Sequence, residues 1–345
     1  MLSPSKSSFP QQFLTFILPF GVALSVAALL IAIVGGSPAE VALSLFRGAF
    51  GTADQTARVL ATLASLLLAS SGLVFAFTAG IYNLGIEGQI TLGGIAATLA
   101  LRMFQDILPA PLAITLGLIA GIAGGMAWGL FAGVLNVFGK VNEIFAGLGL
   151  NFVAQGLALY LIFGPWKREG VASMSGTELF PESLWLPTWG NTELSPVALG
   201  LGILGLAITL VVIQGTYFGL QLRAVGQNLR AAFVLGIPAV QKLLSAFALC
   251  GALAGLTGAV QVLAVFHRLI PNISSGLGFI GLLIVMLVGN SIWAIFPVAL
   301  FFSALNVGSL QLPLELNLES SLAGVIQGIL VLFVLLARGL KTIKA

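Results

Sequence analysis

The sequence contains very little cysteine, histidine or charge. Of its 345 residues, one is cysteine (Cys250), one is histidine (His267) and 7% are Asp, Glu, Lys or Arg. A single cysteine cannot form a disulfide within the chain, and no cysteine-based metal site is expected. A catalytic triad or a histidine metal cluster would have to be built around His267 alone. We therefore expect no metal site, no cofactor and no covalent chemistry on this chain.

What the sequence does contain is apolar residues. They make up 59% of the chain, and the mean hydropathy is +1.11. Soluble domains are roughly half apolar and about a quarter charged, so a soluble fold could not bury this much apolar surface. The formal net charge is only +3 and no basic stripe is present, which argues against nucleic acid as a partner. The composition predicts an all-α integral membrane protein surrounded by lipid.

The apolar runs predict about ten transmembrane helices in one permease-like domain, residues 1–345. A span needs about 20 apolar residues. The first run, 13–34, is too long for a signal-peptide core and is expected to stay as a span. The chain ends in a basic tail from Arg338 to Lys344, which is typical of a cytoplasmic face, and ten spans then place both termini inside. The predicted segments are 13–34, 59–79, 88–101, 112–138, 144–164, 196–214, 243–265, 277–289, 293–311 and 321–337.

Two of these segments, 88–101 and 277–289, are too short to cross the membrane comfortably. Each follows a polar, glycine-containing break, and each is the second segment of a four-span block, 59–164 or 243–337. Paired short segments in corresponding positions point to a transport site in an inverted repeat. The alternative is that both breaks are ordinary loops before short or tilted helices.

Candidates for a translocation pathway are Asn83, Glu87 and Gln89 in and beside the first break, and Asn151 and Gln155, one turn apart in the segment 144–164, which could instead face another helix. Polar groups are costly in hydrocarbon unless they line a cavity or find partners. Glu87 is either a functional carboxylate at membrane depth or a first-turn carboxylate that complements the dipole of the following helix. Asn83 and Gln89 either bind solute or satisfy backbone groups freed by the break, which is the commoner use.

A ridge of glycines at a spacing of four lies in the segment 112–138, and a pair of glycines repeats this spacing in the segment 243–265. Small residues allow helix backbones to approach closely in lipid, so we interpret these glycines as packing residues. They are Gly117, Gly121, Gly125, Gly129, Gly133, Gly251 and Gly255.

Two loops stand out. The predicted external loop, 165–195, carries three tryptophans, which either belong to an interfacial aromatic belt or form a docking surface.

The predicted cytoplasmic loop, 215–242, contains Asn228 as a helix N-cap, a two-turn helix at 229–235, Gly236 at its C′ position and a terminating Pro238. The apolar side of this helix, formed by Leu229 and Phe233, predicts insertion into a groove on a cytoplasmic partner. The alternative is a helix resting on lipid headgroups.

The run from Phe77 to Gln89 resembles the "FNIGxEGQ" signature of ABC-importer permeases for nucleosides and simple sugars, a family related to branched-chain amino acid and ribose permeases. The segments 223–226, 231–232 and 236–237 are similar to the coupling segment of that family, and 253–259 is similar to its next span. The tract Gly164–Trp166 is similar to the longer of two permeases found in the nucleoside branch. The resemblance covers about 40–337 and departs from the pattern at Tyr82 and Asn290.

The resemblance implies a type II ABC-importer permease in the bacterial inner membrane. Its implied partners are a cytoplasmic ABC ATPase, a second permease in a probable heterodimer, and an extracytoplasmic substrate-binding protein. The implied solutes are nucleosides, with simple sugars second. This chain should not bind nucleotide itself, since the stretch from Gly133 to Lys140 departs from a phosphate-binding loop in spacing and lacks its Ser/Thr. The residues expected to couple it to the ATPase are Arg223, Gly226, Asn228, Arg230, Ala231, Phe233 and Gly236.

Two functions from other classes are left open by the sequence. A membrane-embedded enzyme would need acids, histidine or cysteine clustered at one depth, and the sequence shows no such cluster. An ion-coupled secondary transporter would need carboxylates inside its spans, and Glu87 is the single candidate.

Overall fold

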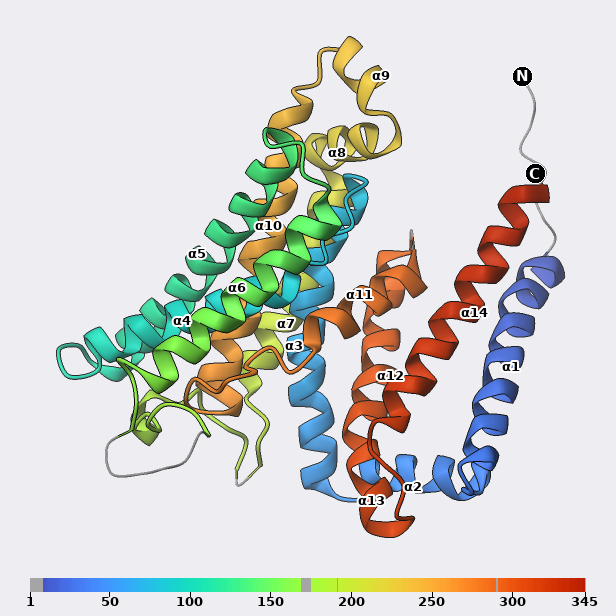
Figure 1. The fold of residues 1–345 in the computed structure, drawn as a ribbon, viewed down its shortest axis with the longest axis horizontal. Coiled ribbons are helices and arrows are strands. Elements are labelled where there is room, and N and C mark those ends of the chain that lie inside the picture. Colours follow the sequence, from blue (N-terminus) through green and yellow to red (C-terminus); the bar gives the residue numbers. More distant parts are fainter. Residues whose placement is uncertain (1–8, 169–174, 191, 290, 345) are drawn as a thin grey trace.

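The computed structural model describes residues 9–168, 175–190, 192–289 and 291–344, and every regular element in these ranges is helical (Figure 1). A helix lies in each of the ten predicted segments. These helices are α1 (Phe9–Ile33), α3 (Ala53–Thr78), α4 (Ile86–Phe104), α5 (Ala110–Val137), α6 (Glu143–Phe163), α7 (Pro196–Gly215), α10 (Ala239–Val260), α11 (Leu277–Val288), α12 (Ile295–Gly308) and α14 (Leu322–Lys344). Asn290 lies outside the described residues.

Eight further elements lie in the connections between these helices. They are α2 (Pro38–Phe50), α8 (Tyr217–Gln227), α9 (Leu229–Val234), α13 (Leu312–Glu315), three short 3-10 turns (Glu182–Leu184, Ile292–Ala294 and Ser309–Gln311) and a π-helical turn (Gln261–Val265). By length and apolar composition, the described residues contain six helices able to cross a membrane, or seven if the bent pair α1–α2 counts as one span. The structure therefore shows an all-helical membrane protein and does not confirm a count of ten spans.

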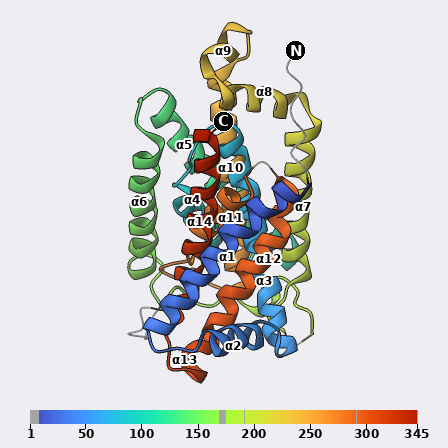
Figure 2. The same cartoon turned by 90° about the vertical axis from the view of Figure 1, so that its right-hand side faces the viewer.

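Helix α3 forms the centre of the molecule. It packs against α7, α10, α11 and α12, and Figures 1 and 2 show it surrounded by them. Apolar side chains lie on every side of it, together with the buried serines Ser65, Ser70 and Ser71, and Leu66, Leu67 and Leu68 have no exposed surface. A helix that is hydrophobic on every side is stable only when other helices or lipid cover it, which explains its central position.

The predicted glycine ridge packs helix against helix. Gly121 and Gly125 of α5 lie against Gly255 of α10, and Gly93 of α4 reaches the same residue. A Cβ added at Gly255 would overlap the carbonyl oxygen of Gly121 and lie 2.8 Å from the Cα of Gly125. The packing interpretation of these glycines is confirmed, and α4, α5 and α10 form one tightly packed group.

Helix α2 was not predicted. It has only 13 residues, and Glu40 and Arg47 interrupt its apolar pattern, so it lacks the long run that marks a span. The chain turns by 103° between α1 and α2. Gly35, at a φ of +88°, lies in this turn, where its lack of a Cβ permits the left-handed conformation. Figure 1 shows α2 lying across the end of the molecule opposite α9.

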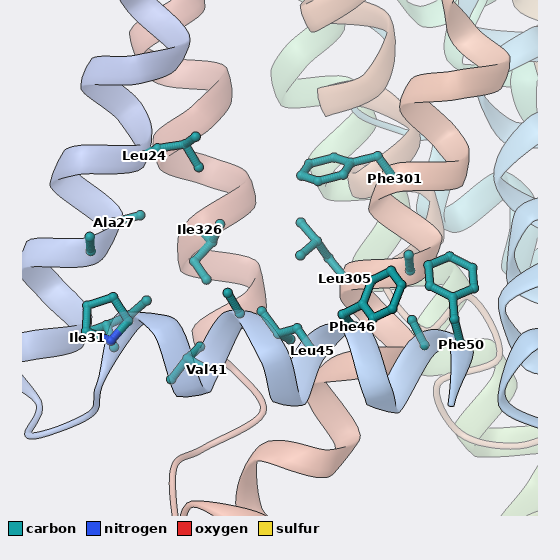
Figure 3. Close-up of a pocket in the computed structure, with 15 residues that line it drawn as sticks. Leu24, Ala27, Ile31, Val41, Leu45, Phe46, Phe50, Phe301, Leu305 and Ile326 are labelled. Carbon is teal, nitrogen blue, oxygen red and sulfur yellow. The ribbon is translucent and has the colours of Figure 1, made fainter. Parts of the chain in front are cut away.

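An apolar cavity of about 380 Å³ lies between α1, α2, α12 and α14 (Figure 3). Leu24, Val41, Phe46, Phe301 and Ile326 are among its lining residues, all of which are apolar. A polar solute would find no hydrogen-bond partner among these side chains. The two polar breaks therefore offer a better site for such a solute.

The described part of the loop after α6 is tied to the segment that follows α10. Backbone hydrogen bonds join Thr177 to Leu269, Phe180 to His267 and Leu186 to Leu263, at 2.9–3.0 Å between nitrogen and oxygen. Trp185 stacks on His267, with the ring centroids 3.7 Å apart. Trp185 is thus a packing residue, while Trp189 is 70% exposed. The contacts fix the path of the chain from α10 toward α11.

Protonation of His267 is expected to loosen this loop. Burial lowers the pKa of His267, which lies beyond the end of the α10 span, so the folded state prefers the neutral imidazole. The unfolded chain binds the proton more readily than the folded chain. The stabilisation contributed by neutral His267 is therefore fully present above about pH 6.5 and is lost as the pH falls through the pKa of the folded state. The melting temperature should therefore be lower at pH 5 than at pH 7.5. The difference should be smaller in His267→Asn, since asparagine tolerates the φ of +54° at this position and carries no titrating group. Equal pH dependence in both proteins would contradict the assignment.

Candidate functional site

The first break, residues 79–85, is held in its conformation by a small hydrogen-bond network of buried side chains. The Asn83 Nδ2 donates to Gln89 Oε1 at 3.1 Å and to the Cys250 Sγ at 3.1 Å, and the Gly85 amide donates to Asn83 Oδ1 at 3.2 Å. Asn83 is 1% exposed and Gln89 is fully buried. Both side chains therefore satisfy each other and the freed backbone, which is the commoner of the two predicted uses.

Helix α6 supplies the cap that α4 lacks. The N-cap residue of α4, Gly85, has no side chain to cap the helix. Instead, Asn151 accepts from the Gly88 amide and donates to the Leu84 carbonyl oxygen, both at 2.8 Å. Gln155, one turn further along α6, donates to the carbonyl oxygen of Pro271 in the second break. Asn151 and Gln155 thus attach α6 to both breaks, and both side chains keep partial exposure.

Glu87 connects the two breaks directly. It is 8% exposed and lies in the first turn of α4. Its Oε1 accepts from the amide of Phe279 at 2.8 Å, and its carboxylate also accepts from the amide of Gly278. Both donors belong to the start of α11. Glu87 therefore lies at the N-terminus of its own helix α4, as one of the two predictions stated. It also lies at the N-terminus of α11, which was not predicted.

Helix α8, which was not predicted, packs on the first break. Thr216 accepts from the Gly219 amide at 3.2 Å and so begins the helix. At its other end, Gly226 lies against the backbone of Thr78 and Gly80. A Cβ at Gly226 would overlap the Thr78 carbonyl oxygen. The 215–242 segment therefore reaches the polar break through a close approach of backbone to backbone at Gly226.

Arg223 is held by the protein itself. Its Nη2 donates to the carbonyl oxygen of Ile213 in the last turn of α7, at 2.8 Å. A cation at a helix C-terminus satisfies an otherwise free carbonyl group and complements the helix dipole. This contact fixes α8 against α7.

Helix α9 has the caps that the sequence predicted. Asn228 Oδ1 accepts from the Ala231 amide at 3.0 Å, and Gly236 has a φ of +77°. At the C-terminus, the amide of Ile237 reaches the carbonyl oxygen of Ala232 at 3.0 Å, which is a Schellman arrangement. Two strong caps explain how a helix of six residues is held at a turn of the chain.

The apolar side chains of α9 face outward at one end of the molecule. Phe233, Val234 and Leu235 are 75%, 84% and 77% exposed, whereas Ala232 is buried against the helices below. Figures 1 and 2 show α9 projecting beyond all other helices, at the end where α14 finishes. The prediction identified Leu229 and Phe233 as the apolar face and missed Val234 and Leu235. A contiguous exposed apolar patch of this kind marks an interaction surface.

Two polar contacts were missed by sequence reasoning. Phe279, whose amide is the partner of Glu87, was assigned only to a span. Gln261 is 4% exposed in the π-helical turn and donates to Ser65 Oγ of α3 at 2.8 Å. A glutamine within an apolar span is the signal that could have found it, since such a side chain needs a partner.

The two four-span blocks pack crosswise. Helix α10 of the second block packs against α4 and α5 of the first, and α3 of the first block packs against α11 and α12 of the second. Figure 1 shows α3 and α10 running in opposite senses, α3 toward the end that carries α9 and α10 away from it. The arrangement is that of a membrane protein whose two broken segments meet near its centre.

Comparison with known proteins agrees with this description. A family model described as "Branched-chain amino acid transport system / permease component" matches residues 55–335, and the chain belongs to this family. The resemblance read from the signature residues is confirmed. The chain is accordingly a multi-pass membrane permease, a transport subunit and not an enzyme.

Three curated relatives show the range of the family. The guanosine ABC transporter permease protein NupP of Bacillus subtilis is 28% identical and covers 90% of this chain and 89% of its own. The nucleoside ABC transporter permease protein NupB of Lactococcus lactis is 28% identical over 77% and 75%. The glucose ABC transporter permease protein TsgB13 of Haloferax volcanii is 29% identical over 82% and 76%.

Proposed function

We propose that this chain is a transmembrane subunit of an ABC importer that translocates nucleosides. The observation that carries the proposal is α9, a short capped helix that presents three exposed apolar side chains at one end of a membrane protein. Lipid alone gives little reason for such a helix, because two turns bury little apolar area. Insertion into a groove on a cytoplasmic ATPase would bury these side chains and so accounts for the helix. The nucleoside assignment rests on the relatives named for guanosine and nucleosides.

The proposal includes an orientation and a set of partners. The end that carries α9 faces the cytoplasm of a bacterium, both termini lie there, and about ten segments cross or enter the inner membrane. The ATPase docks on α8 and α9, with Arg230 and Ala231 in the docking segment. A second permease completes the pathway, and a substrate-binding protein docks at the opposite end, around 165–195. The blocks 59–164 and 243–337 form the inverted repeat.

The proposed mechanism uses no covalent chemistry. ATP-driven closure of the ATPases displaces α8 and α9, and the Gly226–Gly80 contact transmits that displacement to the first break. The helices then rock to open the site to the other side. Of the five pathway candidates, Asn151 and Gln155 line the solute path in this proposal, because they retain exposed surface. Asn83 and Gln89 hold the break in shape.

A sugar importer is the second candidate, favoured by the relative named for glucose. Uptake of radiolabelled adenosine, guanosine and glucose decides between the two candidates in a strain that carries this chain. The same strain without the ATPase is the control. We expect nucleoside uptake that disappears with the ATPase. Uptake that survives its loss would show a secondary transporter, and glucose-specific uptake would favour the sugar importer.

A further inference from the structure

We propose that Glu87 is a positioning residue that clamps the start of α11 to the start of α4, so that both broken segments move as one unit during transport. This inference rests on the proposed function for its role in coupling, and on geometry for the clamp itself. It assigns to Glu87 a contact with protein and none with solute.

Helix α11 has no side-chain cap of its own. Its N-cap residue is Gly276, at a φ of +75°, and no side chain from its own sequence caps the helix. The first amides of a helix need acceptors, and burial makes missing acceptors costly. The Glu87 carboxylate accepts from the amides of Gly278 and Phe279 and so supplies the cap from a different segment.

The site is shaped around this carboxylate. Gly278 is the second residue of α11, and a Cβ there would lie 2.9 Å from Glu87 Oε1 and 2.8 Å from the Ile86 side chain. Glycine is therefore the residue that lets the carboxylate approach the helix end. A solute group would have to displace the two amide donors to reach the carboxylate.

Glu87 lies between the contact with α8 and the start of α11. Gly226 of α8 contacts Gly80 at the beginning of the first break, and Glu87 follows at its end. On the other side, α11 packs against the central helix α3 and against α14. A displacement of α8 thus has a continuous contact route to α11, and its last step is the clamp.

The clamp is tested by hydrogen exchange of the whole chain in detergent micelles. Glu87→Gln replaces two acceptor oxygens by one and turns an NH2 group toward the helix amides. Peptides that cover 274–288 should then exchange about tenfold faster, and Glu87→Asp should lie between the two. Glu143→Gln is the matched control, a first-turn acid of α6 that accepts from the side chain of Asn136 near the end of α5. Unchanged exchange in Glu87→Gln would overturn the clamp.

Its role in coupling is tested by transport with the ATPase present. Glu87→Gln should lower the maximal rate of ATP-dependent adenosine uptake about tenfold. The half-saturating adenosine concentration and the ATP hydrolysis rate should stay near the wild-type values. Full uptake, or a rise in the half-saturating concentration alone, would overturn the proposal. If Glu87→Gln fails to fold, Glu87→Asp, whose shorter side chain withdraws the carboxylate from the amide of Phe279, decides: about threefold loss supports the clamp, and no loss overturns it.

The failure of this inference differs from a failure of the proposed function. Absence of ATP-dependent uptake by the wild type would count against the importer and would leave the exchange result untouched. Normal exchange with active wild-type uptake would count against the clamp alone.

Discussion

Phe233→Asp is expected to reduce ATP-driven uptake by on the order of 100-fold, because a charge would enter the apolar surface that α9 offers to the ATPase. Phe233 is 75% exposed, so the substitution removes little packing within the chain and should leave folding intact. The same preparation should capture far less ATPase in a pull-down from solubilised membranes.

Phe138→Asp serves as the control for this variant. Phe138 is also an exposed aromatic, at 64%, but it ends α5 and lies outside the α8–α9 segment. Its substitution should leave both uptake and ATPase capture near the wild-type values. Equal capture of the ATPase by Phe233→Asp and by wild type would argue that α9 rests on lipid.

Among the substitutions proposed here, Gly255→Val should lower the free energy of unfolding the most. The residue lies where α4, α5 and α10 come together, and a Cβ there would overlap the Gly121 carbonyl oxygen. Neighbouring backbone cannot yield as a side chain can, so overpacking should cost about 3 kcal/mol or more. Thermal unfolding in detergent should show a melting temperature lower by on the order of 5–10 °C.

Gly149→Val is the matched control for the glycine contact. Gly149 lies on α6, and no atom comes within 4 Å of a Cβ placed there. The control should unfold at nearly the wild-type temperature, because valine meets no backbone at this position. Similar losses in both variants would show that helix propensity, and not the close contact of the three helices, determines the effect.

The long apolar helices could be predicted because their signal is local. A run of about 20 apolar residues is itself the requirement for a span, and glycine at every fourth position is itself the packing surface. The caps of α9 are local in the same sense, since Asn228 and Gly236 act within one turn of the backbone they satisfy. Local features of this kind can be assigned to individual residues from the amino-acid sequence alone.

Features that depend on distant residues could not be predicted. The partner of Glu87 lies 192 positions away in the sequence, and the partner of Gln261 lies 196 positions away. Their chemical character signalled a need for partners without identifying them. Helix α8 was missed for a different reason: it is amphipathic and short, and its position depends on a backbone contact between Gly226 and Gly80 that leaves no mark in the apolar pattern.

Photo-crosslinking from position 233 in intact cells tests the central claim most directly, since the claim joins an orientation to a partner. A photoreactive amino acid there should crosslink to the ABC ATPase, and one at position 189, in the loop at the other end, should not. The account would be contradicted if a membrane-impermeant reagent labelled position 233 from outside the cell and no crosslink to an ATPase formed there.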